Sequence, residues 1–182
     1  MENESNVLVH IDGKGICKLK LVGQIKYDSN AKGLNEFINA NIVEKNMKHV
    51  IVDLRECDFI DSTDIGHLVR IAKVQQEKGA EKTTLVYFEN SSVAAAIESV
   101  NVACLFEVCV DCEMGDNHYE NLANIHASKP ELAKIMLNNH KILSDLNDEN
   151  KIKFESVVKY LSGEVSAMER KTTYIPKIIV ND

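Results

Sequence analysis

The residues best suited to reversible chemistry form one short segment, Asp61-Ser62-Thr63-Asp64. Residues 50–54 before it are apolar and rich in β-branched side chains, which predicts a buried strand, and residues 65–72 after it have the apolar spacing of a helix. A phosphate on a serine at a helix start is stabilised by free backbone N–H groups and by the helix dipole. Two roles are therefore open for Ser62: a phosphorylation site, or a plain N-cap, which is the commoner role of such a serine.

The surroundings of Ser62 are acidic, so a phosphate there would change how the surface meets other proteins. Five carboxylates lie close in sequence: Asp53, Glu56, Asp58, Asp61 and Asp64. Phosphorylation would add about −1.5 to −2 charges to this cluster, which would repel an acidic partner. Because the helix start tolerates an anion, we expect the effect to fall on the partner surface and not on the fold.

Catalysis by Ser62 is not expected from the sequence. The six histidines are scattered, and His67, five residues after Ser62, does not share its helix face. No G-x-S-x-G segment occurs, and no nucleophile, base and orienting group form a complete set. We therefore predict that the chain is not an enzyme and that it needs no cofactor.

Three cysteines have a spacing that iron–sulfur and redox sites also use: Cys104, Cys109 and Cys112. Cys109 falls within an apolar run, and Cys57 is the only further candidate ligand, far away in the sequence. Buried structural cysteines are the favoured interpretation, and no metal site is predicted.

The composition excludes several classes of partner. The 182 residues include 28 acidic and 21 basic side chains, a net charge of −7, which disfavours nucleic acids and anionic membrane surfaces. No apolar run approaches the roughly 18 residues of a membrane span, and the first residues do not resemble a signal peptide. Five cysteines without a framework spacing suit a reducing compartment, so we expect a cytoplasmic protein.

Alternating strand and helix patterns predict a mixed α/β fold with four to five strands and packed helices. Strands are expected at residues 7–12, 16–22, 49–54, 83–88 and 106–110. Helices are expected from Ser29 or Asn30 to Met47, from the Ser62 segment to Gly79, and from Ser91 or Ser92 to Val100. Residues 1–111 would form one independently stable domain. Residues 112–182 would form a helical extension, with a hairpin starting at Ser128, broken at residues 147–148, and an edge strand or loose end at 174–180.

The run DFIDSTDIG, following VIVDL, resembles the phosphorylation loop of STAS domains, the family of anti-sigma factor antagonists. The resemblance covers about residues 7–111, with further support at residues 21–23 and 102–106. It implies a STAS-type mixed sheet. It also implies that the modified serine is the one directly after the aspartate, which is Ser62.

The resemblance implies a binding module that sequesters an anti-sigma factor or a signalling enzyme. A serine kinase would modify Ser62 and a phosphatase would reset it. Partner contacts are expected at Asp61, Thr63, Asp64, Asp58 and Lys26. An alternative is a STAS scaffold subunit of a larger sensory or transporter-associated complex.

Two positions depart from the sporulation-type pattern: Asp64 replaces a glycine, and Lys26 replaces an acidic residue. Both look more like the SypA and HsbA type of regulator, which controls biofilm and motility. In that branch a single response regulator supplies both the kinase activity and the phosphatase activity that switch the protein. Residues 140–158 also resemble the C-terminal helical stretch of that branch.

Overall fold

A mixed β-sheet organises the chain in the computed structural model, which describes residues 5–110, 112, 114–115 and 118–173. The strand order is β6-β5-β3-β2-β1-β7, and β4 pairs with the end of β2. β1 is antiparallel to β2 and to β7, whereas the β2–β3, β3–β5 and β5–β6 pairs are parallel. The strands are β1 (Asn6–Ile11), β2 (Ile16–Ile25), β3 (His49–Asp53), β4 (Cys57–Ile60), β5 (Thr84–Val86), β6 (Glu107–Cys109) and β7 (Glu120–Asn121). The predicted α/β fold class is confirmed, with seven strands in the described part of the chain where four to five were expected.

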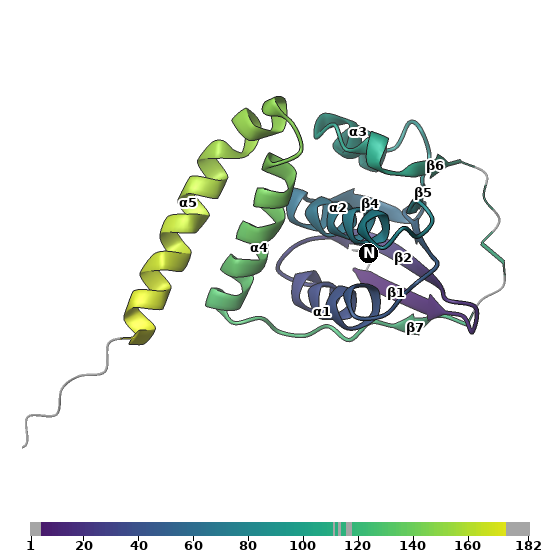
Figure 1. Cartoon of the computed structure of the whole chain (residues 1–182), viewed down its shortest axis with the longest axis horizontal. Helices are drawn as coiled ribbons and strands as arrows, with labels where there is room; N and C mark the ends of the chain where they lie inside the picture. Colours follow the sequence, from purple (N-terminus) through teal and green to yellow (C-terminus); the bar gives the residue numbers. More distant parts are fainter. Residues whose placement is uncertain (1–4, 111, 113, 116–117, 174–182) are drawn as a thin grey trace, which may run out of the picture.

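The helices divide into a group at the sheet and a C-terminal hairpin. Figure 1 shows α1 and α2 side by side against the sheet, with α4 and α5 forming a pair beside them. The helices are α1 (Ala31–Phe37), which continues as a π-helical segment (Ile38–Val43), α2 (Ser62–Glu77), α3 (Ser92–Ser99), a short 3-10 turn (Ala103–Leu105), α4 (Lys129–Ser144) and α5 (Asp148–Thr173).

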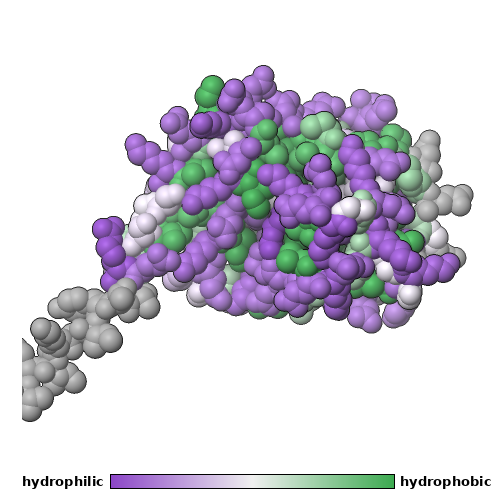
Figure 2. Space-filling view, viewed as in Figure 1, coloured by the Kyte–Doolittle hydropathy of each residue, from purple (hydrophilic) through white to green (hydrophobic). Residues whose placement is uncertain are grey.

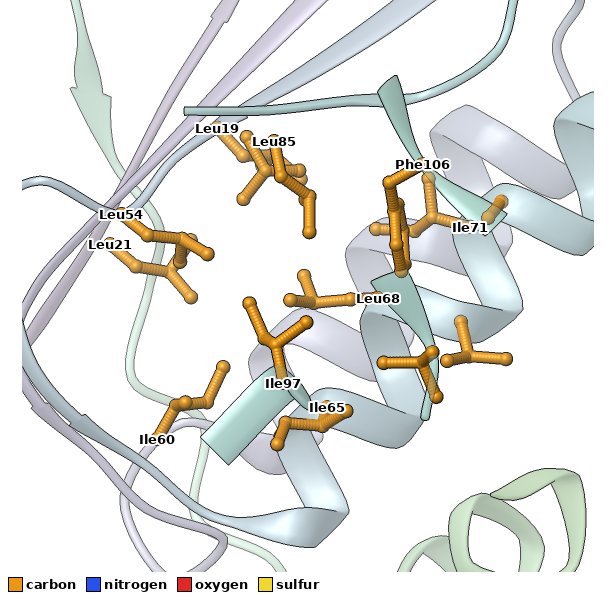
Figure 3. Packing of buried hydrophobic residues seen from close by; sticks show 14 of the residues in the cluster. Leu19, Leu21, Leu54, Ile60, Ile65, Leu68, Ile71, Leu85, Ile97 and Phe106 are labelled. Carbon is orange, nitrogen blue, oxygen red and sulfur yellow. The ribbon is translucent and has the colours of Figure 1, made fainter. Parts of the chain in front are cut away.

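The core forms where α2 and α3 pack on the parallel strands. β3 lies between β2 and β5, which confirms a central strand; Val50 and Val52 are buried on the helix-packed face, whereas Ile51 is half-buried. Figure 3 shows side chains from the strands, α2 and α3 meeting in this core, among them Leu19, Leu21, Leu54, Leu85, Leu68, Ile97 and Phe106. The start of α2 is thereby fixed against the sheet.

Two strands lie where the sequence predicts none. β4 lies between β3 and α2, where no strand is expected, and its backbone pairs with the end of β2, from Gly23–Cys57 to Ile25–Ile60. β7 lies beyond residue 111 and pairs with β1 at the edge of the sheet. Such pairing is a backbone contact, which needs no strong apolar pattern. The first helical segment also ends at Val43 and not at Met47.

The cysteine prediction is wrong for the three residues with the suggestive spacing. Cys109, at the end of β6, forms a disulfide with Cys112, and their Cα atoms are 5.8 Å apart. Cys104 is exposed. The physical reason is that β6 is a three-residue strand paired with β5 at the end of the strand order, so this region is not buried on both sides.

The C-terminal hairpin packs against the same core as the sheet. A capping box starts α4: the Ser128 side chain accepts from the Glu131 backbone, and the Glu131 side chain accepts from the Ser128 backbone. Leu143 of α4 and Phe154 of α5 belong to the core cluster. The division into residues 1–111 and 112–182 remains a prediction; Asp111 and residues 174–180 lie outside the described residues.

α4 crosses α2 at Gly66 in close contact. A Cβ atom added to Gly66 would lie 2.5 Å from the Asn139 Cβ atom and 3.0 Å from both its Cα atom and its carbonyl oxygen. Because two of these three atoms are backbone, the clash cannot be relieved by a side-chain rotation alone. Glycine at this position therefore lets α4 approach α2.

We predict that Gly66→Ala loosens the hairpin. Alanine favours the helix by about 0.8–1.0 kcal/mol, but overpacking costs about 1–3 kcal/mol. Gly163→Ala on α5 is the matched control, because nothing lies within 4 Å of its added Cβ atom. Thermal unfolding should show a lower melting temperature for Gly66→Ala and an equal or higher one for Gly163→Ala. Equal stabilisation by both substitutions would contradict the close crossing.

Candidate functional site

Asp61, and not Ser62, is the N-cap of α2. The Asp61 backbone is extended, and its Oδ1 atom accepts the Asp64 N–H at 3.0 Å. The Oδ2 atom accepts the Tyr27 N–H at 2.8 Å, which ties the end of β2 to this loop. The alternative that Ser62 serves as a plain N-cap is therefore wrong. Ser62 is the first helical residue, and its hydroxyl is not used for capping.

The Ser62 hydroxyl contacts a histidine from the C-terminal extension. Ser62 Oγ lies 2.9 Å from His140 Nε2, and His140 Nδ1 lies 2.8 Å from the Met136 carbonyl oxygen. A carbonyl oxygen only accepts, so Nδ1 carries the proton and Nε2 accepts the Ser62 O–H. Burial lowers the pKa of His140, which favours the same neutral form.

A second contact from α4 fixes the residue after Ser62. The Asn139 Nδ2 atom donates to the Thr63 carbonyl oxygen at 2.9 Å, and both residues are buried. Together with the Gly66 crossing, this bond holds α4 across the first turns of α2. The candidate site is thus built from the β4–α2 loop and from a helix more than 60 residues later in the chain.

The structure brings the predicted partner-binding residues together but does not expose all of them. Lys26 and Asp58 are exposed, and Asp61 is half-buried. Thr63 is 2% exposed and Asp64 is fully buried. While α4 covers α2, an external protein can therefore reach Lys26 and Asp58 but not Thr63 or Asp64.

Ion pairs compensate part of the acidic cluster. Arg55 donates to both carboxylate oxygens of Asp53, at 2.9 and 2.7 Å, and Lys20 lies 2.6 Å from Glu56. Asp53 is therefore buried and paired, whereas the Glu56 side chain remains 59% exposed. Among the described residues, no Lys or Arg pairs with Asp61 or Asp64, the carboxylates closest to Ser62 in sequence.

The charge beside Ser62 comes from Asp61 and Asp64. Burial, and then the neighbouring Asp64 carboxylate, raise the pKa of Asp61 to about 6. Asp64 Oδ1 lies 3.2 Å from His67 Nδ1, and both side chains are fully buried. Within the described residues, Asp64 Oδ2 and His67 Nε2 have no hydrogen-bond partner, and no three His, Cys, Asp or Glu side chains cluster as a metal site. This environment opposes any further negative charge.

Exposed aromatic side chains occur near the ends of the parallel strands. Tyr27 follows β2, Phe59 lies in β4 and Phe88 follows β5, and all three are exposed. The carboxyl ends of parallel strands meet at one edge of a sheet, which is also the edge where α2 begins. Exposed aromatic residues are typical of protein-binding surfaces.

The sequence analysis did not identify His140 or Asn139 as site residues. One signal was present, since this polar pair interrupts the apolar stripe of α4. A buried polar residue on an apolar helix face needs a hydrogen-bond partner, but the sequence does not say which one. Here the partners lie 76 and 78 residues away.

Comparison with known families supports the fold described above. The family described as the STAS domain matches residues 9–109, a segment that runs from β1 to the end of β6. The hairpin of α4 and α5 lies outside the matched residues. No curated protein matches the chain. None of the helices in the described residues is long and apolar enough to cross a membrane.

We predict that the Asp61 carboxyl titrates with a midpoint near pH 6, which carbon-detected NMR of the side chain can measure. Its folded pKa is raised above the ordinary aspartate value of 3.8, so its contribution to stability is present below about pH 4 and is lost as the pH rises to 6. Asp64→Asn should lower the midpoint, because it removes a neighbouring charge. Asp58→Asn is the control and should leave it unchanged. A midpoint near 4 in the unaltered chain would refute the described environment.

Proposed function

The chain belongs to the STAS domain family, and we propose that it is a protein-binding switch of the anti-sigma factor antagonist kind, controlled by phosphorylation of Ser62. The observation that carries this proposal is the placement of Ser62. Ser62 is the first residue of α2. Asp61 caps the helix, so the Ser62 hydroxyl is not needed for capping and instead contacts the neutral histidine His140. A phosphate there would lie at the positive end of the helix dipole, where Asp61 already accepts the Asp64 N–H.

The proposed partners are a serine kinase, a phosphatase and a bound target. The target would be an anti-sigma factor or a signalling enzyme. The sequence resemblance to the SypA and HsbA type supports a single response regulator as the source of both enzymatic activities, and a role in biofilm or motility. Neither a metal nor a cofactor belongs to the proposed function of this chain, and no catalytic activity of its own is proposed.

The unphosphorylated chain would bind its target through the exposed part of the site. Lys26 and Asp58, together with the exposed aromatic rings of Tyr27, Phe59 and Phe88, offer the contact area beside Ser62. Phosphorylation would add about −1.5 to −2 charges to this surface. A target packed over the loop would then have to desolvate a dianion, which weakens binding unless an Arg or Lys of the target pairs with it.

Phosphorylation would also act on the chain's own α4. The hydroxyl proton that His140 now accepts would be gone, and a phosphate oxygen would face the lone pair of neutral His140 Nε2. Asp61 and Asp64 add repulsion from the other side. We propose that α4 moves away from α2 in response, which differs from the expectation from the sequence alone that only the partner surface would change, because the sequence did not reveal the Ser62–His140 contact. Thr63 and Asp64 would then become accessible, so the two states would present different surfaces to partners.

We predict that Ser62 is the main phosphorylation site in native cells, measured by phosphopeptide mapping of the tagged chain. Ser92 is the matched comparison. Like Ser62, it is the first residue of a helix that the preceding residue caps, and it is exposed to solvent. Ser62→Ala should abolish most of the phosphate, and Ser92→Ala should leave it unchanged. Thr63 is buried and should carry little. Phosphate mainly on Ser92 or Thr63 would refute the proposal.

We also predict that partner capture depends on the charge at Ser62. Pull-down with Ser62→Ala and Ser62→Asp, followed by mass spectrometry, should give a target whose recovery differs by about tenfold, the effect of about 1.4 kcal/mol. A scaffold subunit would behave differently. It would elute from native extract in one large complex whatever residue stands at position 62, and that result would favour the scaffold alternative.

A further inference from the structure

A polar hollow lies where α1, α2 and α4 meet. Its volume is about 450 Å³, within the range of about 300–1,000 Å³ typical of small-molecule sites. Arg70 from α2, Asn35 and Asn39 from the first helical segment, and Lys141 and Asp145 from the end of α4 are among the lining residues. The hollow is therefore shared between the sheet-packed helices and the C-terminal hairpin.

Arg70 is a half-buried cation whose hydrogen-bond partners are neutral. Its Nη1 atom donates to Asn35 Oδ1 at 2.9 Å, and its Nη2 atom donates to Asn39 Oδ1. Within the described residues no carboxylate lies within 4.0 Å of the guanidinium. Partial burial removes water from this charge and lowers the pKa of Arg70. An anion in the hollow would supply the missing countercharge.

The other lining groups also favour an anion. Asn35 and Asn39 turn their oxygens to Arg70, which leaves the donor ends of both amides for other partners. Lys141 adds a second cation, and Asp145 is the one acidic side chain among the lining residues. This excess of donors and positive charge occurs in a chain with a net charge of −7. The hollow is therefore a local exception to the charge of the molecule.

We propose that this hollow binds a small phosphate-bearing molecule, with the phosphate placed against Arg70 and Lys141. The planar guanidinium matches two phosphate oxygens, and the remaining N–H groups of Arg70 can donate to them. The volume exceeds what a single phosphate ion fills, so a larger phosphorylated compound, up to the size of a mononucleotide, fits best. The site is separate from Ser62, and its lining is complete while α4 is docked on α2.

Binding there would stabilise the docked hairpin. A ligand held by Arg70 on α2 and by Lys141 on α4 contacts both sides of the α2–α4 contact. It therefore favours the state in which the two helices are together. The concentration of the ligand would then set how readily α4 leaves α2.

Calorimetric titration of the purified full chain at low salt tests the site, with inorganic phosphate, pyrophosphate and ATP as separate probes. We expect saturable binding of at least one probe. A preference for ATP would show that sugar and base contribute, whereas equal binding of pyrophosphate would assign the affinity to the phosphates. Either result supports the site.

The variants locate the binding. Arg70→Gln should weaken it about tenfold, as expected for loss of a charged bidentate contact, and Lys141→Gln should weaken it by about threefold. Asp145→Asn should tighten it, because a repelling charge is removed. Lys159→Gln, at an exposed lysine of α5, is the control and should leave the affinity for the probe unchanged.

Lys141 and Asp145 are exposed, so the variants at these two positions stay informative even if Arg70→Gln is unstable. Absence of saturable binding for all three probes, or unchanged binding in both Arg70→Gln and Lys141→Gln, would overturn the proposal.

Discussion

The close crossing of α4 over α2 at Gly66 is the contact on which the candidate site depends. With a larger residue at position 66, Asn139 could not approach, and its hydrogen bond to the Thr63 carbonyl oxygen would be lost. His140, the next residue of α4, would then no longer reach Ser62. One position without a side chain thus places a buried histidine on the hydroxyl at the start of α2. The same crossing closes one side of the polar hollow around Arg70.

The hairpin is held by apolar and polar contacts of different kinds. Leu143 and Phe154 are buried in the common core, which provides stabilisation that is insensitive to charge. The contacts at Ser62 and Thr63 are hydrogen bonds, each worth about 0.5–1.5 kcal/mol, and they lie beside two carboxylates. A phosphate would act on the polar contacts alone. Figure 2 shows a largely hydrophilic surface in which hydrophobic residues lie between the hydrophilic ones, also along the hairpin. The strength with which the hairpin docks therefore depends on a balance of apolar and polar contacts that covalent modification can shift.

Local signals in the sequence predicted the elements but not the contacts between them. The central strand β3 and the starts of α3 and α4 depend on neighbouring residues, and the sequence analysis placed them, with Ser91 or Ser92 open as the cap of α3 and Ser128 as the start of α4. β4 was not predicted, because its pairing with β2 is a backbone contact between distant segments. The alternative of an N-cap at Ser62 was wrong because Asp61 caps α2, and the sequence could not decide between them since both residue types cap helices well. The pairing of Ser62 with His140 spans 78 residues and required the three-dimensional arrangement.

The central claim is that phosphate on Ser62 weakens the contact of α4 with α2. Hydrogen–deuterium exchange of the chain, with and without stoichiometric phosphate on Ser62, measures this directly. The account predicts faster exchange at the backbone amides of α4 (Lys129–Ser144) and unchanged exchange in the central strand β3 (His49–Asp53). Equal protection of α4 in both forms would contradict it.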